Sequence, residues 1–221
     1  MIAHPGDGSS ILVGLGEAFP WVALKSKRMT GQICQLQPFN EFRFDDCIAY
    51  LSSTHNRALT VYEIMKLHVM IDVYHTLDRG KPAIGGVIWP FTNGPVSRSS
   101  KGRVAIWRKK YETTAQMPDG FLIIDEGDRL SIKATRVPDE DDFSVAEISA
   151  MDRAWKDVVE LLDEKGFEAS QAFFHQDSFI GQAWKNARNR GQSLDWMEIV
   201  DEYDKAHPGE DHSKIKIMLQ I

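Results

Sequence analysis

The sequence has little cysteine, no long apolar run and no excess of basic charge. Cys34 and Cys47 are its two cysteines, and they fit no metal-binding or redox spacing, so we expect free thiols in a reducing compartment. The most apolar N-terminal run, residues 11–24, contains Glu17 and Pro20 and has no basic flank before it. A signal peptide or a membrane span needs an uninterrupted apolar core. We therefore expect a cytoplasmic protein without a membrane segment.

The charge balance argues against a general nucleic-acid-binding surface. The chain has 32 acidic and 26 basic residues, a formal net charge of -6, whereas phosphate binding usually needs a basic surface. Hydrophobic residues make up 43% of the 221 residues, with six Trp and eleven Phe. This composition is typical of a folded chain with a full core, and the length predicts one domain with at most an added arm.

Composition and periodicity divide the chain into three regions. Residues 1–40 are rich in Gly, Pro and Ser at the start and predict an N-terminal arm with short strands at residues 10–13 and 33–36. Residues 41–206 predict a mainly α domain with a small β element, an α+β class. Residues 207–221 form a polar tail whose end is compatible with a short terminal strand.

The first helix of the body is predicted to begin near Asn40. Asp45 or Asp46 would lie in its first turn, where a carboxylate suits the helix dipole. The apolar residues expected to share its buried face are Phe42, Phe44, Ile48 and Leu51.

A central buried helix is predicted at about residues 60–79. Thr60 and Glu63 have the spacing of a capping box, which marks a helix start. Apolar residues cover most of the helix circumference between residues 61 and 77, so other elements must surround it. Gly80 and the following Pro82 predict its end.

Two further elements follow before the C-terminal helices. Residues 98–110 contain six basic residues and no acidic one, which predicts a helix with one solvated basic face. Residues 121–124 and 130–135 have the pattern of two strands, so a β-hairpin is predicted within residues 121–135.

Three helices are predicted after the hairpin. Ser144 and Glu147 form a second capping box, and Gly166 is expected to close the helix that it opens. The apolar positions of that helix are Val145, Ile148, Met151, Trp155, Val158, Val159 and Leu162. Shorter helices are predicted at residues 178–190, capped by Asp177, and 194–205, capped by Ser193.

His68, Asp72 and His75 are the strongest candidates for chemistry. Their spacing puts two imidazoles and a carboxylate on one side of the central helix, a donor set that could hold a metal. The favoured alternative is a structural hydrogen bond between Asp72 and a histidine, because no second ligand motif accompanies them. We therefore predict no metal site.

Other patterns do not require an enzyme. Gly14 and Gly16 lack the third glycine of a nucleotide-binding loop, and no cofactor is predicted. His175 before Asp177 could be a base and its orienting group, but no nucleophile accompanies them. The favoured interpretation is that Asp177 caps a helix and His175 packs at its start. No catalytic residue is predicted.

A stiff turn precedes the basic segment. Pro95 fixes its own φ and restricts Gly94, while Asn93 can bond to nearby backbone. A loop that is ordered before binding loses less entropy on association. Trp89 and Phe91 could act as aromatic anchors beside the turn, although Trp89 and Pro95 could equally pack the turn onto the central helix.

The chain resembles the Panacea domain, or SocA-like antitoxin domain, of bacterial and prophage toxin–antitoxin pairs. The resemblance rests on the ordered motifs KLHVMID at residues 66–72, GKP at 80–82 and WPFTNGPV at 89–96, and on AWKNA at 183–187 after His175. It spans about residues 42–200. The GPV turn and the AWK helix are its most specific marks.

This resemblance implies an antitoxin that binds and silences a toxin encoded by the adjacent gene, without a catalytic group. The residues expected to contact the toxin, with the basic side chains as a charged rim, are Trp89, Phe91, Asn93, Gly94, Pro95, Val96, Arg98, Lys101 and Arg103.

Two alternative functions and one question of assembly stay open at this point. The basic segment at residues 98–110 could serve a DNA-binding regulator of a prophage or toxin–antitoxin operon, although no DNA-binding motif is visible. A metal-dependent enzyme using His68, Asp72 and His75 is the weaker alternative. The sequence does not decide whether the chain forms a homo-oligomer.

Overall fold

The computed structural model describes residues 37–114, 120–127 and 129–220. The predicted strands at residues 10–13 and 33–36, the Gly14 to Gly16 segment and Cys34 lie outside the described residues. The described elements are α1 Glu41–Thr54, β1 Leu59–Thr60, α2 Val61–Arg79, β2 Ile88–Phe91, β3 Gly94–Ser97, α3 Arg98–Thr114, β4 Phe121–Asp125, β5 Leu130–Ala134, η1 Glu140–Asp142, α4 Val145–Trp155, η2 Lys156–Glu160, α5 Leu161–Ala172, η3 Phe173–Asp177, α6 Phe179–Arg190, α7 Trp196–Ala206 and α8 Ser213–Leu219. The fold is mainly helical with a small β element, as predicted.

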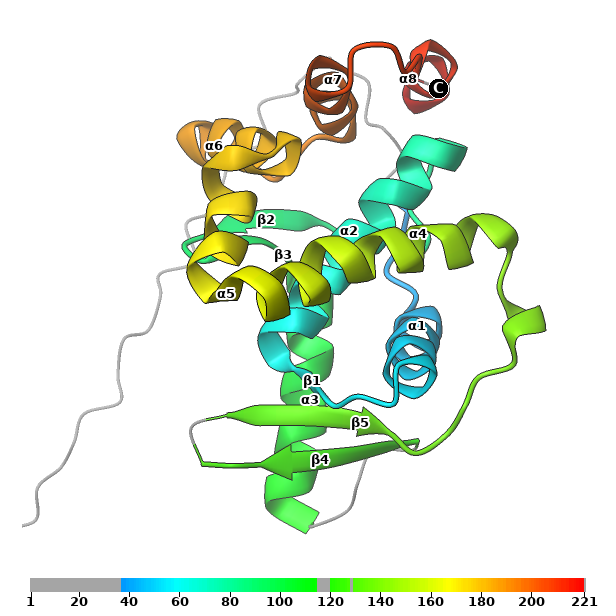
Figure 1. Ribbon diagram of the computed structural model, residues 1–221, viewed down its shortest axis with the longest axis vertical. Helices are drawn as coiled ribbons and strands as arrows, with labels where there is room; N and C mark the ends of the chain where they lie inside the picture. The colour runs from blue at the N-terminus through cyan, green and yellow to red at the C-terminus, as the bar shows by residue number, and fades with distance from the viewer. Residues whose placement is uncertain (1–36, 115–119, 128, 221) are drawn as a thin grey trace, which may run out of the picture. The chain divides into compact units, whose positions relative to one another are not determined.

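Helix α2 lies at the centre of the described fold. Figure 1 shows α4 crossing it, the β4–β5 sheet near its N-terminal end and α7 and α8 near the other end, while α6 lies beside β2 and β3. Thr60 Oγ1 accepts from the Glu63 amide at 3.2 Å, and Glu63 Oε2 accepts from the Thr60 amide at 2.6 Å, which confirms the capping box. Every residue from 63 to 77 is buried. Gly80 ends the helix with a φ of 71°, as expected of a glycine cap.

Asp72 fixes the loop that follows α2. Its buried carboxylate accepts hydrogen bonds from the amides of Ile84 at 2.7 Å and Gly85 at 2.9 Å. His68 Nε2 lies 3.1 Å from Asp72 Oδ2, so the predicted structural pairing of Asp72 with a histidine is confirmed. His75 instead places Nδ1 2.8 Å from the carbonyl oxygen of Lys81. These side chains serve the local fold.

The predicted hairpin at residues 121–135 is part of a three-stranded antiparallel sheet of order β1-β5-β4. Ile132 of β5 lies opposite both Ile123 of β4 and Leu59 of β1. Strand β1 is missing from the prediction because two residues cannot show an alternating pattern. Ser52 Oγ of α1 accepts from the Ala134 amide at 2.9 Å, which ties α1 to the sheet.

Two residues predicted to be buried are exposed. Phe42 is 74% exposed and Val145 is 82% exposed, whereas Phe44, Ile48 and Leu51 are fully buried. Residues two apart on a helix point about 200° away from each other, so Phe42 and Phe44 cannot share a face. Val145 is the first residue of its helix. Asp45 and Asp46 lie beyond the first turn, where the acidic residue is Glu41, because α1 begins at Glu41.

Helix ends in the C-terminal half differ from the prediction by one or two residues. Ser178 caps α6 by accepting from the Gly181 amide at 3.1 Å, and Asp177 is the last residue of η3. Asp195, rather than Ser193, caps α7. In both cases a second capping residue stands nearby and local sequence does not rank the two. Gly166 has a φ of 80° and a ψ of 178°, which are not helical, so it ends one helical segment at the predicted position, and a second segment of α5 continues after it.

The end of the tail is a helix, so the predicted terminal strand is wrong. Alternation of Ile and Lys in residues 215–217 suits a strand, but Ile215 and Leu219 are also one helical turn apart, and both pack on the core. Lys216 lies 2.7 Å from carboxylates of both Asp201 and Asp204 of α7. These ion pairs and the apolar contacts favour the helix. Among the described residues, no helix is long and apolar enough to cross a membrane.

The Asp72 network predicts a large stability effect. Asp72→Ala leaves two buried amides without their acceptor and removes one of the two oxygens that lie 3.1 Å from His68 Nε2, so we expect a loss of at least about 3 kcal/mol in the free energy of unfolding. The control is Asp78→Ala, which removes the partly exposed partner of Arg153 and should change stability by less than about 1 kcal/mol. Urea denaturation measures both, and equal effects of the two substitutions contradict the prediction.

Candidate functional site

The stiff turn predicted before the basic segment is the tip of an antiparallel hairpin. Strands β2 and β3 pair Trp89 with Val96 and Phe91 with Gly94, and Thr92 and Asn93 form an exposed two-residue turn. Gly94 has a φ of 94°, a conformation that side chains rarely adopt. The sequence locates the turn but not its strands, since Pro90 and Pro95 cannot donate ladder hydrogen bonds and weaken the strand pattern.

Lys66 of α2 binds the turn of this hairpin through hydrogen bonds to its backbone. Its Nζ donates to the carbonyl oxygens of Asn93 at 2.7 Å and Pro95 at 3.2 Å, and lies 4.6 Å from the ring centroid of Phe174. Lys66 is 1% exposed. Burial lowers the pKa of Lys66 to about 7, because no described carboxylate pairs with the ammonium group. A Cβ on Gly94 would lie 2.5 Å from Nζ, so any larger residue at this position requires the Lys66 side chain to shift.

Helix α6 holds the other side of the hairpin. Trp184 Nε1 donates to the carbonyl oxygen of Phe91 at 3.0 Å, and the Leu194 amide donates to that of Ile88 at 2.9 Å. His175 stacks on Trp184 with 4.5 Å between ring centroids, which confirms that it packs at the start of α6. Burial, and then the nearby Lys66, lower the pKa of His175. The two motifs at residues 89–96 and 183–187 therefore meet in space.

The aromatic side chains of β2 are covered by cations from α3. The guanidinium of Arg98 lies 4.0 Å from the Trp89 ring, and Lys101 Nζ lies 4.8 Å from the ring centroid of Phe91. Both rings are half-buried, and both cations belong to exposed residues. Cation–π contacts of this kind contribute about 0.5–1 kcal/mol at exposed sites. They hold α3 and the hairpin as one surface.

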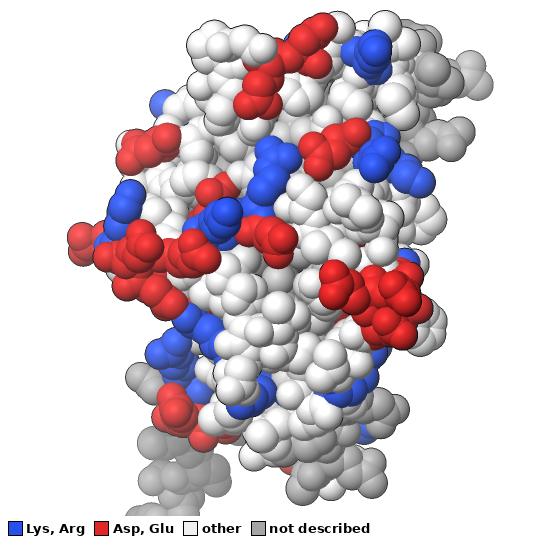
Figure 2. Space-filling view, turned by 45° about the vertical axis from the view of Figure 1, so that its right-hand side comes forward, with Lys and Arg blue, Asp and Glu red and all other residues white. Residues whose placement is uncertain are grey.

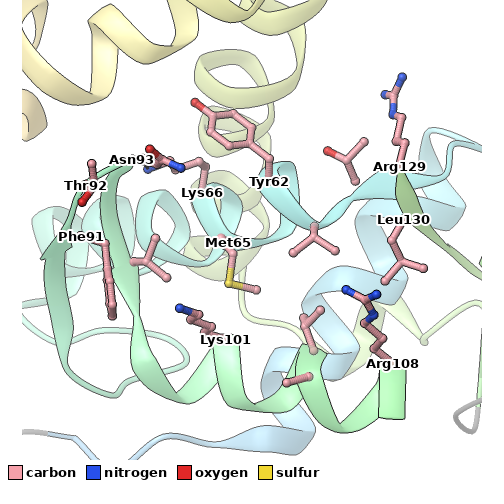
Figure 3. Close-up of a pocket in the computed structure, with 15 residues that line it drawn as sticks. Tyr62, Met65, Lys66, Phe91, Thr92, Asn93, Lys101, Arg108, Arg129 and Leu130 are labelled. Atoms are coloured by element: carbon pink, nitrogen blue, oxygen red, sulfur yellow. Dashed lines mark hydrogen bonds between the residues drawn. The ribbon is translucent and has the colours of Figure 1, made fainter. Parts of the chain in front are cut away.

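A groove of about 720 Å³ opens beside the hairpin, between α2, α3 and β5. In Figure 3 the hairpin tip, Tyr62 and Arg129 surround it, and Met65 and Lys101 point toward its centre. The residues that give it an apolar lining are Val61, Met65, Phe91, Val96, Val104, Ala105 and Leu130, and its basic residues are Lys66, Lys101, Arg108 and Arg129. None of the described lining residues is acidic. The groove thus combines apolar contact area with positive charge.

Eight of the nine predicted contact residues divide into three groups. Phe91, Asn93, Val96 and Lys101 line the groove. Gly94 and Pro95 are buried next to the turn. Trp89 and Arg98 stack on each other farther from the turn and do not line the groove.

Arg103 stands apart from the other contact residues. It ion-pairs with Asp45 and with Glu41 of α1, the latter at 3.2 Å, and so joins α1 to α3 rather than serving as a free charged rim.

Among the groove residues outside the predicted contact set, the aromatic and basic ones are Tyr62, Lys66, Arg108 and Arg129. Lys66 is the one with a detectable signal, since a lysine inside a helix that is apolar on all sides must find polar partners within the fold. Tyr62 follows the N-cap of α2, and nothing in the sequence distinguishes it from an ordinary partly exposed helix residue. Arg108 and Arg129 resemble ordinary solvated charges, so only the tertiary structure reveals their position.

Neither metal nor extended polyanion binding gains support from the geometry. Within residues 37–114, 120–127 and 129–220, no group of three His, Cys, Asp or Glu side chains is placed to hold a metal. The basic helix predicted at residues 98–110 is confirmed as α3, with Val104 and Trp107 buried. On the face shown in Figure 2, basic and acidic groups are intermixed and no continuous basic surface forms.

No protein-family model, curated protein or solved structure matches this chain.

Substitution at Gly94 tests how tightly the hairpin is held. Gly94→Ala forces a positive φ on a residue with a side chain and pushes Cβ against Lys66, so we expect a loss of about 1–3 kcal/mol in unfolding free energy. Gly102→Ala is the control, because Gly102 lies within α3 with open space around it, and it should stabilise the protein by about 0.5–1 kcal/mol. If urea denaturation shows that both substitutions change the free energy of unfolding in the same direction, the hairpin is not constrained as described.

The lowered pKa of Lys66 predicts a pH dependence of stability. The pKa rises from about 7 in the folded chain to the usual 10.5 on unfolding, so the unfolded state binds more protons between these values. The unfolding free energy should therefore rise with pH from about 7 to 10, by at most about 1.4 kcal/mol per unit, relative to Lys66→Met. Denaturant titrations at several pH values measure this difference, with Lys109→Met as the matched control. A constant difference between wild type and Lys66→Met excludes the buried neutral amine.

Proposed function

We propose that this protein is a cytoplasmic antitoxin that neutralises a cognate toxin by direct protein–protein binding. The groove and the hairpin tip form the binding surface. The observation that supports this most directly is the preformed hairpin, held by Lys66 from α2 and by Trp184 from α6 beside an apolar groove. A surface ordered before association loses less conformational entropy when a partner binds.

The position of the family-like motifs supports the same proposal. The motif at residues 66–72 supplies Lys66, the GPV turn supplies Gly94 and Pro95, and the AWK helix supplies Trp184. Lys66 binds the turn from α2 and Trp184 binds the Phe91 carbonyl of the same hairpin from α6, although these motifs are far apart in the chain. Motifs that jointly build one surface are expected where that surface carries the function of the domain.

The side chains that could have served catalysis have structural partners. Asp72 binds loop amides, and His75 Nδ1 faces the carbonyl of Lys81. His175 stacks on Trp184 beneath the hairpin. These contacts serve the local fold, and the proposed binding function needs no catalytic group. The proposed toxin is the product of the adjacent gene.

Co-expression tests the proposal directly. The adjacent gene product should arrest growth when expressed alone, and growth should return when this protein is co-expressed and the two proteins co-purify. Phe91→Ala removes an apolar side chain from the groove wall and should reduce rescue, whereas Ile106→Ala, which removes an exposed apolar side chain outside the groove lining, should not. A gene product that is equally toxic with and without this protein, or that never co-purifies with it, rules the proposal out.

A further inference from the structure

We propose that the groove binds an acidic amphipathic segment of the partner protein, with apolar side chains on the groove floor and carboxylates paired with Lys101 and Arg129. This inference rests on the proposed function for the partner being a polypeptide. Its basis is the distribution of paired and unpaired charges over the described fold, together with the shape and lining of the groove.

Arginines elsewhere in the described fold are mostly matched by carboxylates of the chain itself. Arg103 pairs with Asp45, Arg136 with Asp46 and Arg153 with Asp78. Each pair joins residues that are far apart in the chain. These three arginines are therefore already neutralised, and they offer little to an anionic partner.

The groove differs from those surfaces. Among the described residues, no carboxylate lies within ion-pair distance of Lys101, Arg129 or Lys66, and no acidic residue lines the groove. Arg108 is the exception among its cations, since its Nε lies 2.6 Å from Glu112 Oε1. Unpaired cations beside low-dielectric walls produce a positive potential that attracts carboxylates. The groove is thus complementary to negative charge supplied from outside.

The apolar floor narrows the class of ligand. Met65 of α2, Val96 of β3 and Val104 of α3 meet the groove from three elements. A volume of about 720 Å³ lies within the range of roughly 300–1,000 Å³ that buries a drug-sized ligand, so it has room for a few side chains rather than for a whole helix. A segment with large apolar residues on one side and Asp or Glu beside them satisfies both the floor and the rim.

A polyanion such as nucleic acid fits less well. Its phosphates would meet the cations but would leave the apolar floor without a partner. A second copy of this chain is another source of carboxylates. The experiment below separates that outcome from the proposed one.

Carbodiimide crosslinking of the purified complex tests the proposal, because this reagent joins a lysine amine directly to a carboxylate in contact with it. We expect Lys101 to be linked to an Asp or Glu of the partner, within a segment that also carries large apolar residues. Lys109, exposed on the same helix but absent from the groove lining, is the internal control and should give no such link. Mass spectrometry of the digested complex identifies both lysines.

Affinity measurements provide the second readout. Lys101→Glu and Arg129→Glu should each weaken the complex at least about tenfold, and increasingly so at low salt, because a like charge then faces the partner's carboxylates. Lys101→Arg retains the charge and should bind within about twofold while losing the crosslink. Lys109→Glu should leave the affinity unchanged. All three positions are exposed, so circular dichroism of each of the four variants should match the wild type.

The outcomes separate this inference from the proposed function. If the complex forms but the charge reversals leave its affinity unchanged, the groove inference is wrong and the antitoxin proposal stands. If the protein alone gives a link from Lys101 to a second copy, or if nucleic acid abolishes the crosslink, the groove belongs to that ligand. If no complex with the adjacent gene product forms, the proposed function itself fails.

Discussion

The hairpin depends on one buried amino group. Lys66 lies inside the helix that every other layer of the described fold surrounds, and its partners are carbonyl oxygens of Asn93 and Pro95 rather than a carboxylate. Carbonyl dipoles stabilise a buried cation less than an opposite charge does. The lysine therefore lowers the stability of the fold to some extent. Its role is to position the turn, because the carbonyl oxygens of Asn93 and Pro95 must both lie within hydrogen-bond distance of Nζ.

The sequence predicts those parts of this arrangement that are set by neighbours in the chain. Both capping boxes, the glycine that ends α2 and the β4–β5 hairpin depend on residues a few positions apart, and each is confirmed. Predictions that required a choice between equally good local patterns were less accurate, as with Ser178 against Asp177 and with the helical end of the tail. In those cases tertiary contacts decide between alternatives of similar local energy.

The groove could not be predicted from the sequence, because its character depends on which charges find partners. Arg103 and Lys101 are two residues apart on one basic helix, yet Arg103 is neutralised by α1 while Lys101 faces the hairpin and the groove. Residues two apart on a helix point in nearly opposite directions. Helical periodicity predicts that Lys101 and Arg103 point to different sides of α3, but it does not predict which of the two side chains lies near a carboxylate. That information is available only once α1 is placed beside α3.

Helix α2 positions both of the chain segments that follow it, and this explains why so many polar groups are tolerated inside it. Asp72 accepts from the amides of the loop at residues 84–85, and Lys66, nearly two turns earlier, donates to the carbonyls of the hairpin. The Asp72 carboxylate thus accepts from backbone amides, and the Lys66 amino group donates to backbone carbonyls. Each of these buried polar side chains is therefore satisfied by backbone groups of the opposite polarity. Because the two side chains come from one rigid helix, the loop and the hairpin cannot move independently. The groove wall that contains Phe91 and Val96 is consequently set by the core itself, which is the property that a binding surface requires if it is to recognise a partner without first rearranging.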